Sequence, residues 1–211
     1  MLSPANLLNG ASFAKFLFDR PILKDNPHQE LLDQDEYFEV PRNRAPALVV
    51  CATELFERFA EATRAFPAAQ IDQGLWYLLS YPFDLPELLH NPEIASELQI
   101  RCMRAMQIPF RDYYAHVWEP YHGTAFFMWW DLVSYERDTP FESAALDALE
   151  SILALPSKRC QMAALHGLLQ SGHARAVSGV EEYFADHWNE LSSEDISWME
   201  VVRDGKPLRA G

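Results

Sequence analysis

The sequence predicts an all-α protein, a single domain in which about eight or nine antiparallel helices pack as a compact array. Apolar residues recur at the spacing of amphipathic helices, whereas the alternation typical of strands is nearly absent. Prolines and capping residues mark short turns that separate one predicted helix from the next. At 211 residues, with 49% hydrophobic and 23% charged residues, the chain can bury one substantial core.

The first 46 residues are expected to hold one helix and an irregular acidic connection. Ser3 followed by Pro4 is a typical cap and first helical position, so a helix is predicted over about residues 4 to 18. Two prolines in DRPILKDNPHQ then interrupt the helical pattern. We therefore interpret residues 19 to 46 as the connection.

The middle of the chain predicts a series of helices divided by prolines. APALVVCATELFERFAEATRAF predicts a helix that ends at Pro67, and AAQIDQGLWYLLSY predicts the next. Asn91 and Pro92 are expected to cap a third helix that runs through about Met106. Pro109 should interrupt it before a short helix in FRDYYAHVWEP. The apolar faces predicted for the first and third helices consist of Leu48, Ala52, Leu55, Phe56, Phe59 and Thr63, and of Ile94, Leu98, Cys102 and Met106.

Capping signals divide the next part of the chain. AFFMWWDLVSYE, residues 125 to 136, predicts a helix that is apolar on almost every side. Thr139 and Glu142 form a capping box at the start of FESAALDALESILAL. Ser157 then precedes KRCQMAALHGLLQ, which SGH is expected to end.

The C-terminal region predicts two more helices and a tail. A second capping box, Ser178 with Glu181, is expected to open VEEYFADHWNEL. SSEDISWMEVV predicts a last short helix. Residues 203 to 211 have no apolar face and are expected to be frayed.

The helix pair FESAALDALESILAL and KRCQMAALHGLLQSGH, joined by a tight Leu-Pro-Ser turn, resembles the antiparallel hairpin of HEAT-like repeats over residues 139 to 190. QGLWYLLSY at 73 to 81 also aligns with AALHGLLQS at 163 to 171, leucine on leucine. This resemblance implies a compact HEAT-like array. The Trp-Trp-Asp and Ala-Leu-His-Gly segments are similar to segments of bacterial proteins that have no assigned activity, so they imply none.

Charge is the strongest compositional signal about function. The chain has 31 acidic and 17 basic residues and a net charge of -14, which repels phosphate backbones and favours basic protein partners. Nucleic-acid binding is therefore not expected. No apolar run reaches the length of a membrane span, and Lys15 lies inside the N-terminal apolar stretch where a secretory signal would be uncharged. We expect a cytoplasmic protein that does not contact the membrane.

Acidic and aromatic residues alternate near the C-terminus, in EEYFADHWNELSSEDISWMEV. One interpretation is a solvated helix face. The other is a docking surface for a basic protein, because aromatic anchors among acids suit an electrostatically steered interface. An oligomer built on exposed aromatic surface is compatible with either, and the sequence carries no signal of symmetry. The candidate partner-binding residues are Glu181, Glu182, Asp186, Trp188, Glu190, Glu194, Asp195 and Trp198.

A second candidate site is the aromatic segment around Asp131. Trp129 and Trp130 at helical spacing favour a central core helix, in which Asp131 needs a cap, an arginine such as Arg111 or a histidine such as His166 as partner. The alternative is a ligand pocket of Trp129, Trp130, Asp131 and His166, suited to a cation or an amine. His166 itself lies among small and apolar residues, which favours a core histidine over a catalytic one.

Motifs for cofactors, metals and nucleophilic catalysis are missing. Cys51, Cys102 and Cys160 are widely spaced and are expected to be buried reduced thiols. A composite metal site of Asp112, His116, His122 and Asp131 is conceivable but not favoured, and no zinc motif, phosphate loop or dinucleotide fingerprint is present. We expect no metal, no cofactor and no catalytic residue. A site assembled from separate helices is not excluded.

Two classes of function follow from these observations. The favoured class is a non-enzymatic helical scaffold that presents an acidic, aromatic surface to a protein partner, as an immunity protein does to a bacterial toxin. The alternative is an enzyme or small-ligand receptor with its pocket near Asp131 and His166.

Overall fold

In the computed structural model, the described residues are 10–22, 44–80, 83–116, 124–132, 140–188, 192 and 196. These residues are mostly helical and include no strand, so the all-α prediction is confirmed. None of the described helices is long and apolar enough to cross a membrane. The elements are α1 (Gly10–Phe18), α3 (Ala45–Glu57), α4 (Phe59–Thr63), α5 (Ala68–Leu79), α6 (Leu85–Leu89), α7 (Ser96–Ala105), α8 (Gln107–Pro109), the π-helical η3 (Phe110–Tyr114), α9 (Thr124–Leu132), α10 (Pro140–Leu153), α11 (Lys158–Ser171) and α12 (Ala174–His187).

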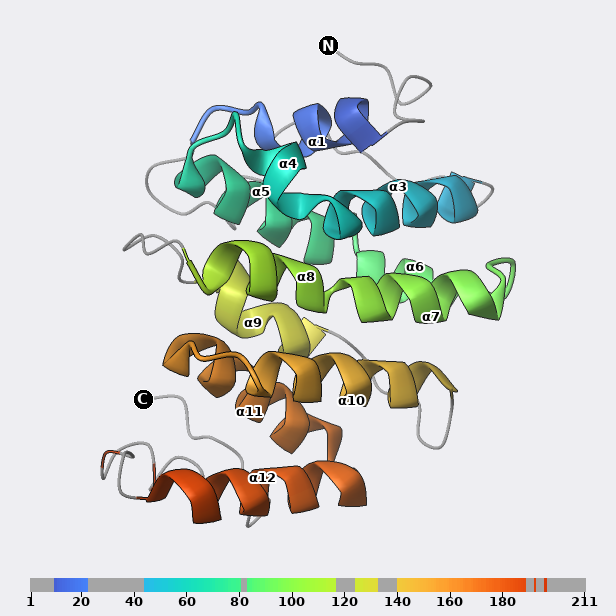
Figure 1. The fold of residues 1–211 in the computed structure, drawn as a ribbon. Coiled ribbons are helices and arrows are strands. Elements are labelled where there is room, and N and C mark those ends of the chain that lie inside the picture. Colours follow the sequence, from blue (N-terminus) through green and yellow to red (C-terminus); the bar gives the residue numbers. More distant parts are fainter. Residues whose placement is uncertain are drawn as a thin grey trace.

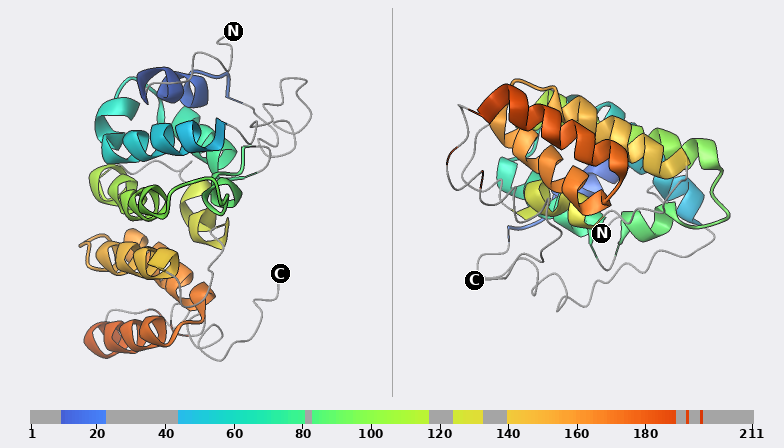
Figure 2. Two further views of the ribbon diagram at one scale, coloured as in Figure 1. Left: turned by 90° about the vertical axis from the view of Figure 1, so that its right-hand side faces the viewer. Right: turned by 90° about the horizontal axis from the view of Figure 1, so that it is seen from below.

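The helices stack in chain order along one axis, with α1 at one end and α12 at the other (Figure 1). Seen from the side, α3, α7, α10 and α12 form one layer, and α5, α9 and α11 form a second layer against it (Figure 2). Each helix buries its apolar stripe between the two layers, as amphipathic helices require. The stacking leaves α12 as the last described helix of its layer.

The core is richest in aromatic side chains where α9 meets its neighbours. Trp129 and Trp130 are completely buried. The Trp129 ring lies 5.5 Å from that of Phe56 on α3 and 5.4 Å from that of Phe110 in η3, measured between centroids. The AFFMWWDL segment is thus a core helix that packs on several elements, with Met128 on its exposed side.

The amphipathic pattern located the buried face of α3 and α4 correctly, because all six residues predicted for it are buried. The helix is not continuous, however. It breaks at Arg58, whose φ of -122° and ψ of 30° are not helical, and α4 begins at Phe59. Arg58 and Glu61 are paired at 2.7 Å on the exposed side of this break.

The predicted start of the third helix was wrong. Asn91 does not cap a helix but forms a turn, in which its Oδ1 accepts the Glu93 N–H at 2.9 Å. The helix α7 begins only at Ser96, after Ala95. An asparagine side chain can stabilise a local turn as readily as a helix start, so the Asn-Pro pair does not decide between them.

The third helix ends as the sequence predicts. The helix α7 stops at Ala105, Met106 forms a turn, and Pro109 lies in the next short helix, α8. A π turn follows Pro109, in which the Ala115 N–H donates to the Phe110 carbonyl at 2.9 Å. This turn brings Tyr113 and Tyr114 into the core, with both side chains buried.

The second capping box was wrong as well. Ser178 lies inside α12, where its hydroxyl donates to the Ala174 carbonyl at 3.3 Å. The helix begins at Ala174, and the His173 side chain accepts the Arg175 N–H at 3.0 Å as its cap. The S-x-x-E spacing is met by chance in the middle of a helix.

Other helix boundaries agree with the sequence. The helix α10 begins at Pro140, and α11 follows Ser157 and ends at Gly172, whose φ is +61°. Several predicted features lie outside the described residues: Ser3, Pro4, Thr139, most of residues 19 to 46, most of SSEDISWMEVV, and residues 203 to 211. Within SSEDISWMEVV, the Ile196 N–H donates to the Ser192 carbonyl at 3.0 Å.

Candidate functional site

The candidate site lies on α12, which is attached to the array along one side. Ala176, Val180 and Tyr183 are buried against the neighbouring helices. The Tyr183 hydroxyl donates to Oε1 of Gln161 on α11 at 2.9 Å, and the His187 ring stacks on the Tyr183 ring with centroids 4.2 Å apart. These contacts fix the rotation of α12 about its axis and therefore determine which residues face outward.

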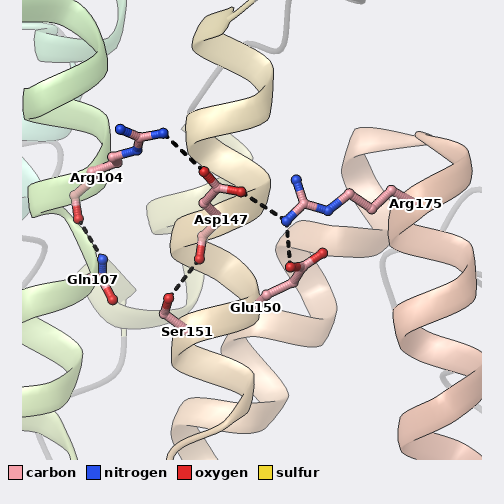
Figure 3. A network of polar contacts seen from close by, with 6 residues as sticks. All are labelled: Arg104, Gln107, Asp147, Glu150, Ser151 and Arg175. Carbon is pink, nitrogen blue, oxygen red and sulfur yellow. Dashed lines mark hydrogen bonds and ion pairs between the residues drawn. The ribbon is translucent and has the colours of Figure 1, made fainter.

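A network of charged side chains fastens α12 to α10 (Figure 3). The Arg175 guanidinium donates to Oδ1 of Asp147 at 2.8 Å and to Oε2 of Glu150 at 2.5 Å. The second oxygen of Asp147 accepts from Arg104 on α7 at 3.2 Å. Burial raises the pKa of Asp147, but the Arg175 and Arg104 guanidiniums outweigh it and hold that pKa below its usual range. One carboxylate thus links three stacked helices.

Another ion pair joins two helices of the same layer. Arg101 on α7 donates to both carboxylate oxygens of Glu57 on α3, at 2.8 and 2.7 Å. Together with the Asp147 network, this pair joins α3, α7, α10 and α12 along the outer side of their layer. A surface cavity of about 500 Å³ lies beside Arg101 and Arg104 on α7, and its cations are already paired with Glu57 and Asp147.

The outward side of α12 carries acids and apolar side chains together. Val177 is 44% exposed and Trp188 is 53% exposed. Glu181, Glu182 and Asp186 are exposed too, and within the described part of the chain none of their carboxylates forms an ion pair or a hydrogen bond. We call Val177, Glu181, Glu182, Asp186 and Trp188 the α12 face.

The α12 face contains four of the eight residues that the sequence predicted for partner binding. The other four, Glu190, Glu194, Asp195 and Trp198, lie outside the described residues. Sequence reasoning missed Val177, because the supposed capping box placed it before the helix rather than within it. The sequence did contain a signal for Val177: it lies eleven residues before Trp188, which is three helical turns and places both on one side of a helix.

Asp131 and His166 form the second candidate site. The carboxylate of Asp131, near the end of α9, is hydrogen-bonded to Nε2 of His166 on α11, and each side chain is about one-fifth exposed. Trp129 and Trp130 do not open onto solvent, since both are fully buried with indole N–H groups that have no partner. Of Arg111 and His166, the two side chains expected as partners of Asp131, His166 is the one that binds it.

The other expected partner is engaged elsewhere. Arg111 donates to Asp112 at 2.5 Å, beside it in η3. Asp112 and Asp131 therefore belong to separate pairs, and His122 of the composite metal site lies outside the described residues. Among the residues that are described, no three His, Cys, Asp or Glu side chains come together as a metal site.

Asp72 on α5 is a half-buried acid that sequence reasoning did not single out. Burial raises its pKa to about 6, although a hydrogen bond from the Ala125 N–H in the first turn of α9 lowers it. Its Oδ1 is buried without a hydrogen-bond partner. Asp72 acts as an N-cap for α9 from a neighbouring helix, a contact between distant parts of the chain that leaves no local sequence signal.

Comparison of the chain with protein-family models, with curated proteins and with solved structures finds no match. The α12 face and the Asp131–His166 pair are therefore the features of the molecule that bear on its function.

Proposed function

We propose that this chain is a non-enzymatic, HEAT-like helical scaffold that binds a basic protein partner through the α12 face. The observation that carries the proposal is the occurrence on one exposed helix of the Trp188 ring and of the carboxylates of Glu181, Glu182 and Asp186, which are unpaired within the described part of the chain. Large aromatic side chains are frequent anchors of protein interfaces, and surrounding charge of one sign accelerates association with a partner of the other sign.

The position of Asp186 supports a role outside the helix itself. Asp186 lies in the last turn of α12, where the helix macrodipole places partial negative charge. A carboxylate at that position is unfavourable for the helix by roughly 0.3 to 1 kcal/mol. Arg175 does not offset it, because it lies at the other end of α12 and its guanidinium is bound to Asp147 and Glu150 on α10. A basic partner would neutralise this charge.

The HEAT-like arrangement is part of the proposal and has its own support. Helices stack in two layers in chain order, so that each packs mainly on its neighbours, as in helical-repeat proteins (Figure 2). Such arrays present extended surfaces to protein ligands. Neutralisation of a basic toxin, the role of an immunity protein, is one form that this function takes, and it requires only a soluble acidic surface in the cytoplasm.

The test is site-specific photo-crosslinking in the cells that produce the protein. A photoreactive residue in place of the exposed Ala185, which adjoins the α12 face, should capture one basic protein in stoichiometric amount. The same residue in place of the exposed Arg64, at the other end of the stack, is the control and should not capture it. Equal capture at both positions, or none at Ala185, contradicts the proposal.

Affinity for the captured protein should then depend on the α12 face. Trp188→Ala is expected to weaken the complex by roughly 2 kcal/mol or more, with Trp198→Ala acting in the same direction. Neutralising Glu181, Glu182 and Asp186 together should slow association and reduce its dependence on salt. The matched control neutralises three exposed glutamates elsewhere on the surface, Glu87, Glu93 and Glu97, and should leave association nearly unchanged.

A second candidate function is small-ligand binding or catalysis at the Asp131–His166 pair. It is favoured by a carboxylate and an imidazole joined from two helices and still partly open to solvent, an arrangement that can accept and donate protons. Asp131→Asn should then abolish a ligand-induced increase in Tm while the fold persists. If Asp131→Asn only lowers the Tm and no ligand raises that of the parent protein, the pair is structural.

A further inference from the structure

One line of side chains on α12 has the spacing of a helix-packing seam. Val177, Glu181, Phe184 and Trp188 follow one another at intervals of four, three and four residues, so they lie on one side of the helix. Phe184 and Trp188 contact each other, with ring centroids 6.3 Å apart. We call these four residues the α12 seam. Phe184 is half-buried, whereas the other three are exposed.

Small residues border the seam on one side. Ala174, Ser178 and Ala185 are all exposed and lie next to it at helical spacing. Side chains of this size let a second helix approach closely, and the larger seam residues then fill the space between the two axes. Large seam residues beside a row of small residues are the pattern expected of a helix–helix interface.

The seam lies on the side of α12 away from α10, and its half-buried Phe184 also packs against the core. At about 100° per residue, Phe184 lies on the side of α12 opposite Arg175, the residue that reaches back to Asp147 on α10. Earlier in this layer α3 packs on α7 and α7 on α10, and α12 follows α10 in the same layer, joined to it through Arg175 (Figures 1 and 2). No described element covers α12 in this way.

The negative charge of Glu181 and of the whole chain restricts which partner can pack on the α12 seam. In an antiparallel packing of two copies about the middle of the seam, Glu181 would face Phe184 of the other copy and would lose its water without gaining a cation, and two chains of net charge -14 would be brought together. A carboxylate at the centre of an otherwise apolar seam instead favours a cation opposite it, and a charged residue at such a position fixes the register of helix packing.

We infer that the α12 seam binds one amphipathic, basic α-helix of a partner protein, with a Lys or Arg opposite Glu181. This inference rests on the proposed function and specifies its partner. The bound helix continues the stack as the next helix of the layer would. With 14 residues, α12 is about 21 Å long, so a partner helix of about 15 residues spans the seam. Glu182 and Asp186 lie on the other side of α12, outside the contact, and add to the negative charge that attracts a basic partner.

The direct test uses synthetic peptides and the full-length protein. The ordered peptide has about 15 residues, leucines at the spacing of the seam, lysines on the remaining positions and one lysine at the central seam position. The scrambled peptide has the same composition with its leucines distributed around the helix. Fluorescence anisotropy should show binding of the ordered peptide at least about tenfold tighter than that of the scrambled one.

A charge swap tests the register. Glu181→Lys should weaken binding of the ordered peptide about tenfold or more, and a peptide with glutamate at its central position should restore it. Glu93→Lys makes the same charge change on an exposed residue before α7 and is the control, with a much smaller expected effect. Circular dichroism of both variants establishes that α12 remains folded.

The outcomes are distinct. No binding of the ordered peptide, equal binding of the scrambled peptide, or equal effects of Glu181→Lys and Glu93→Lys overturns the inference. Dimerisation in sedimentation experiments that Trp188→Asp abolishes also overturns it, because a second copy would then occupy the seam. The crosslink at Ala185 reports a partner of any shape, so its success together with failure of the peptides leaves the proposed function standing without the helical partner.

Discussion

Gly167 on α11 lies directly against Trp130 on α9. A Cβ added at Gly167 would stand 2.7 Å from the Trp130 Cβ and 2.6 Å from Cδ2 of Leu149 on α10. Atoms do not approach this closely, so three helices meet at a point where only glycine fits. The Asp131–His166 pair is adjacent in both helices, and the close approach at Gly167 brings its two members within reach.

Replacing Gly167 with alanine should therefore destabilise the protein. Alanine is favoured over glycine inside a helix by about 1 kcal/mol, but overpacking of the core costs typically about 1 to 3 kcal/mol and should outweigh it. Gly179→Ala is the matched control, since Gly179 is inside α12 and an added Cβ meets nothing within 4 Å. It should stabilise the protein by roughly 0.5 to 1 kcal/mol. Urea unfolding measures the free energy of unfolding of both variants. A Gly167→Ala variant that is more stable than the parent protein would contradict the close packing.

The network around Asp147 should couple α10 to α12 weakly and in a salt-dependent way. Because Arg175 and Asp147 are more than one-third exposed, a double-mutant cycle with Arg175→Met and Asp147→Asn should give a coupling of only about 0.5 to 1 kcal/mol. The lowered pKa of Asp147 means that its contribution is present above the unfolded-state pKa and is lost as the pH falls through the folded-state value. A coupling that persists in high salt and acid would refute the ion-pair account.

Asp72 should give the opposite dependence on pH. Its pKa is raised from 3.8 to about 6, so the folded state holds the proton more tightly than the unfolded chain does. Its contribution to stability is complete below the unfolded-state pKa and is lost as the pH rises through about 6, which corresponds to roughly 3 kcal/mol at most. Asp72→Asn keeps an oxygen for the Ala125 N–H and cannot ionise. Urea unfolding measures the free energy of unfolding across the pH range. That of Asp72→Asn should rise relative to that of the parent protein as the pH increases, and a constant difference between the two would contradict this.

The three cysteines should be unreactive in the folded protein. Cys51, Cys102 and Cys160 are all buried. Burial raises the pKa of each thiol, in Cys102 to about 12 despite a hydrogen bond from Thr53, so little thiolate exists at neutral pH. A thiol reagent should modify none of them until urea unfolds the chain, after which all three react. Rapid labelling of one thiol under native conditions would reveal local opening around that residue.

The spacing of apolar residues was sufficient to predict which face of a helix is buried. The face that includes Leu48, Phe56 and Thr63 could be read from the spacing alone, because each residue is buried for the same local reason. Helix starts were less predictable. Asn91 and Ser178 carry favoured capping side chains yet cap no helix, whereas His173 does, because the choice among possible caps depends on where packing allows the helix to begin.

The candidate site was predictable in composition but not in geometry. Acids and tryptophan near the C-terminus were evident, but only the true start of α12 places Val177 on the same line as Trp188. Contacts between distant segments depend on the stacking of helices rather than on local pattern. The Asp131–His166 pair was one of two partners expected for Asp131, and the packing of α9 on α11 decides between them. The contact of Asp72 with the first turn of α9 had no sequence signal at all.

The π turn at Phe110–Tyr114 accommodates one residue more than an α-helix would in the same length. Every side chain after it is thereby rotated by about 100° relative to an uninterrupted helix. Within the turn itself, Tyr114 lies edge-on to Phe126 of α9, with centroids 4.8 Å apart, and Tyr113 lies against Phe59 of α4. A single-residue deletion in this segment would move both tyrosines out of these contacts, so the number of residues here is matched to the core as well as to the helix.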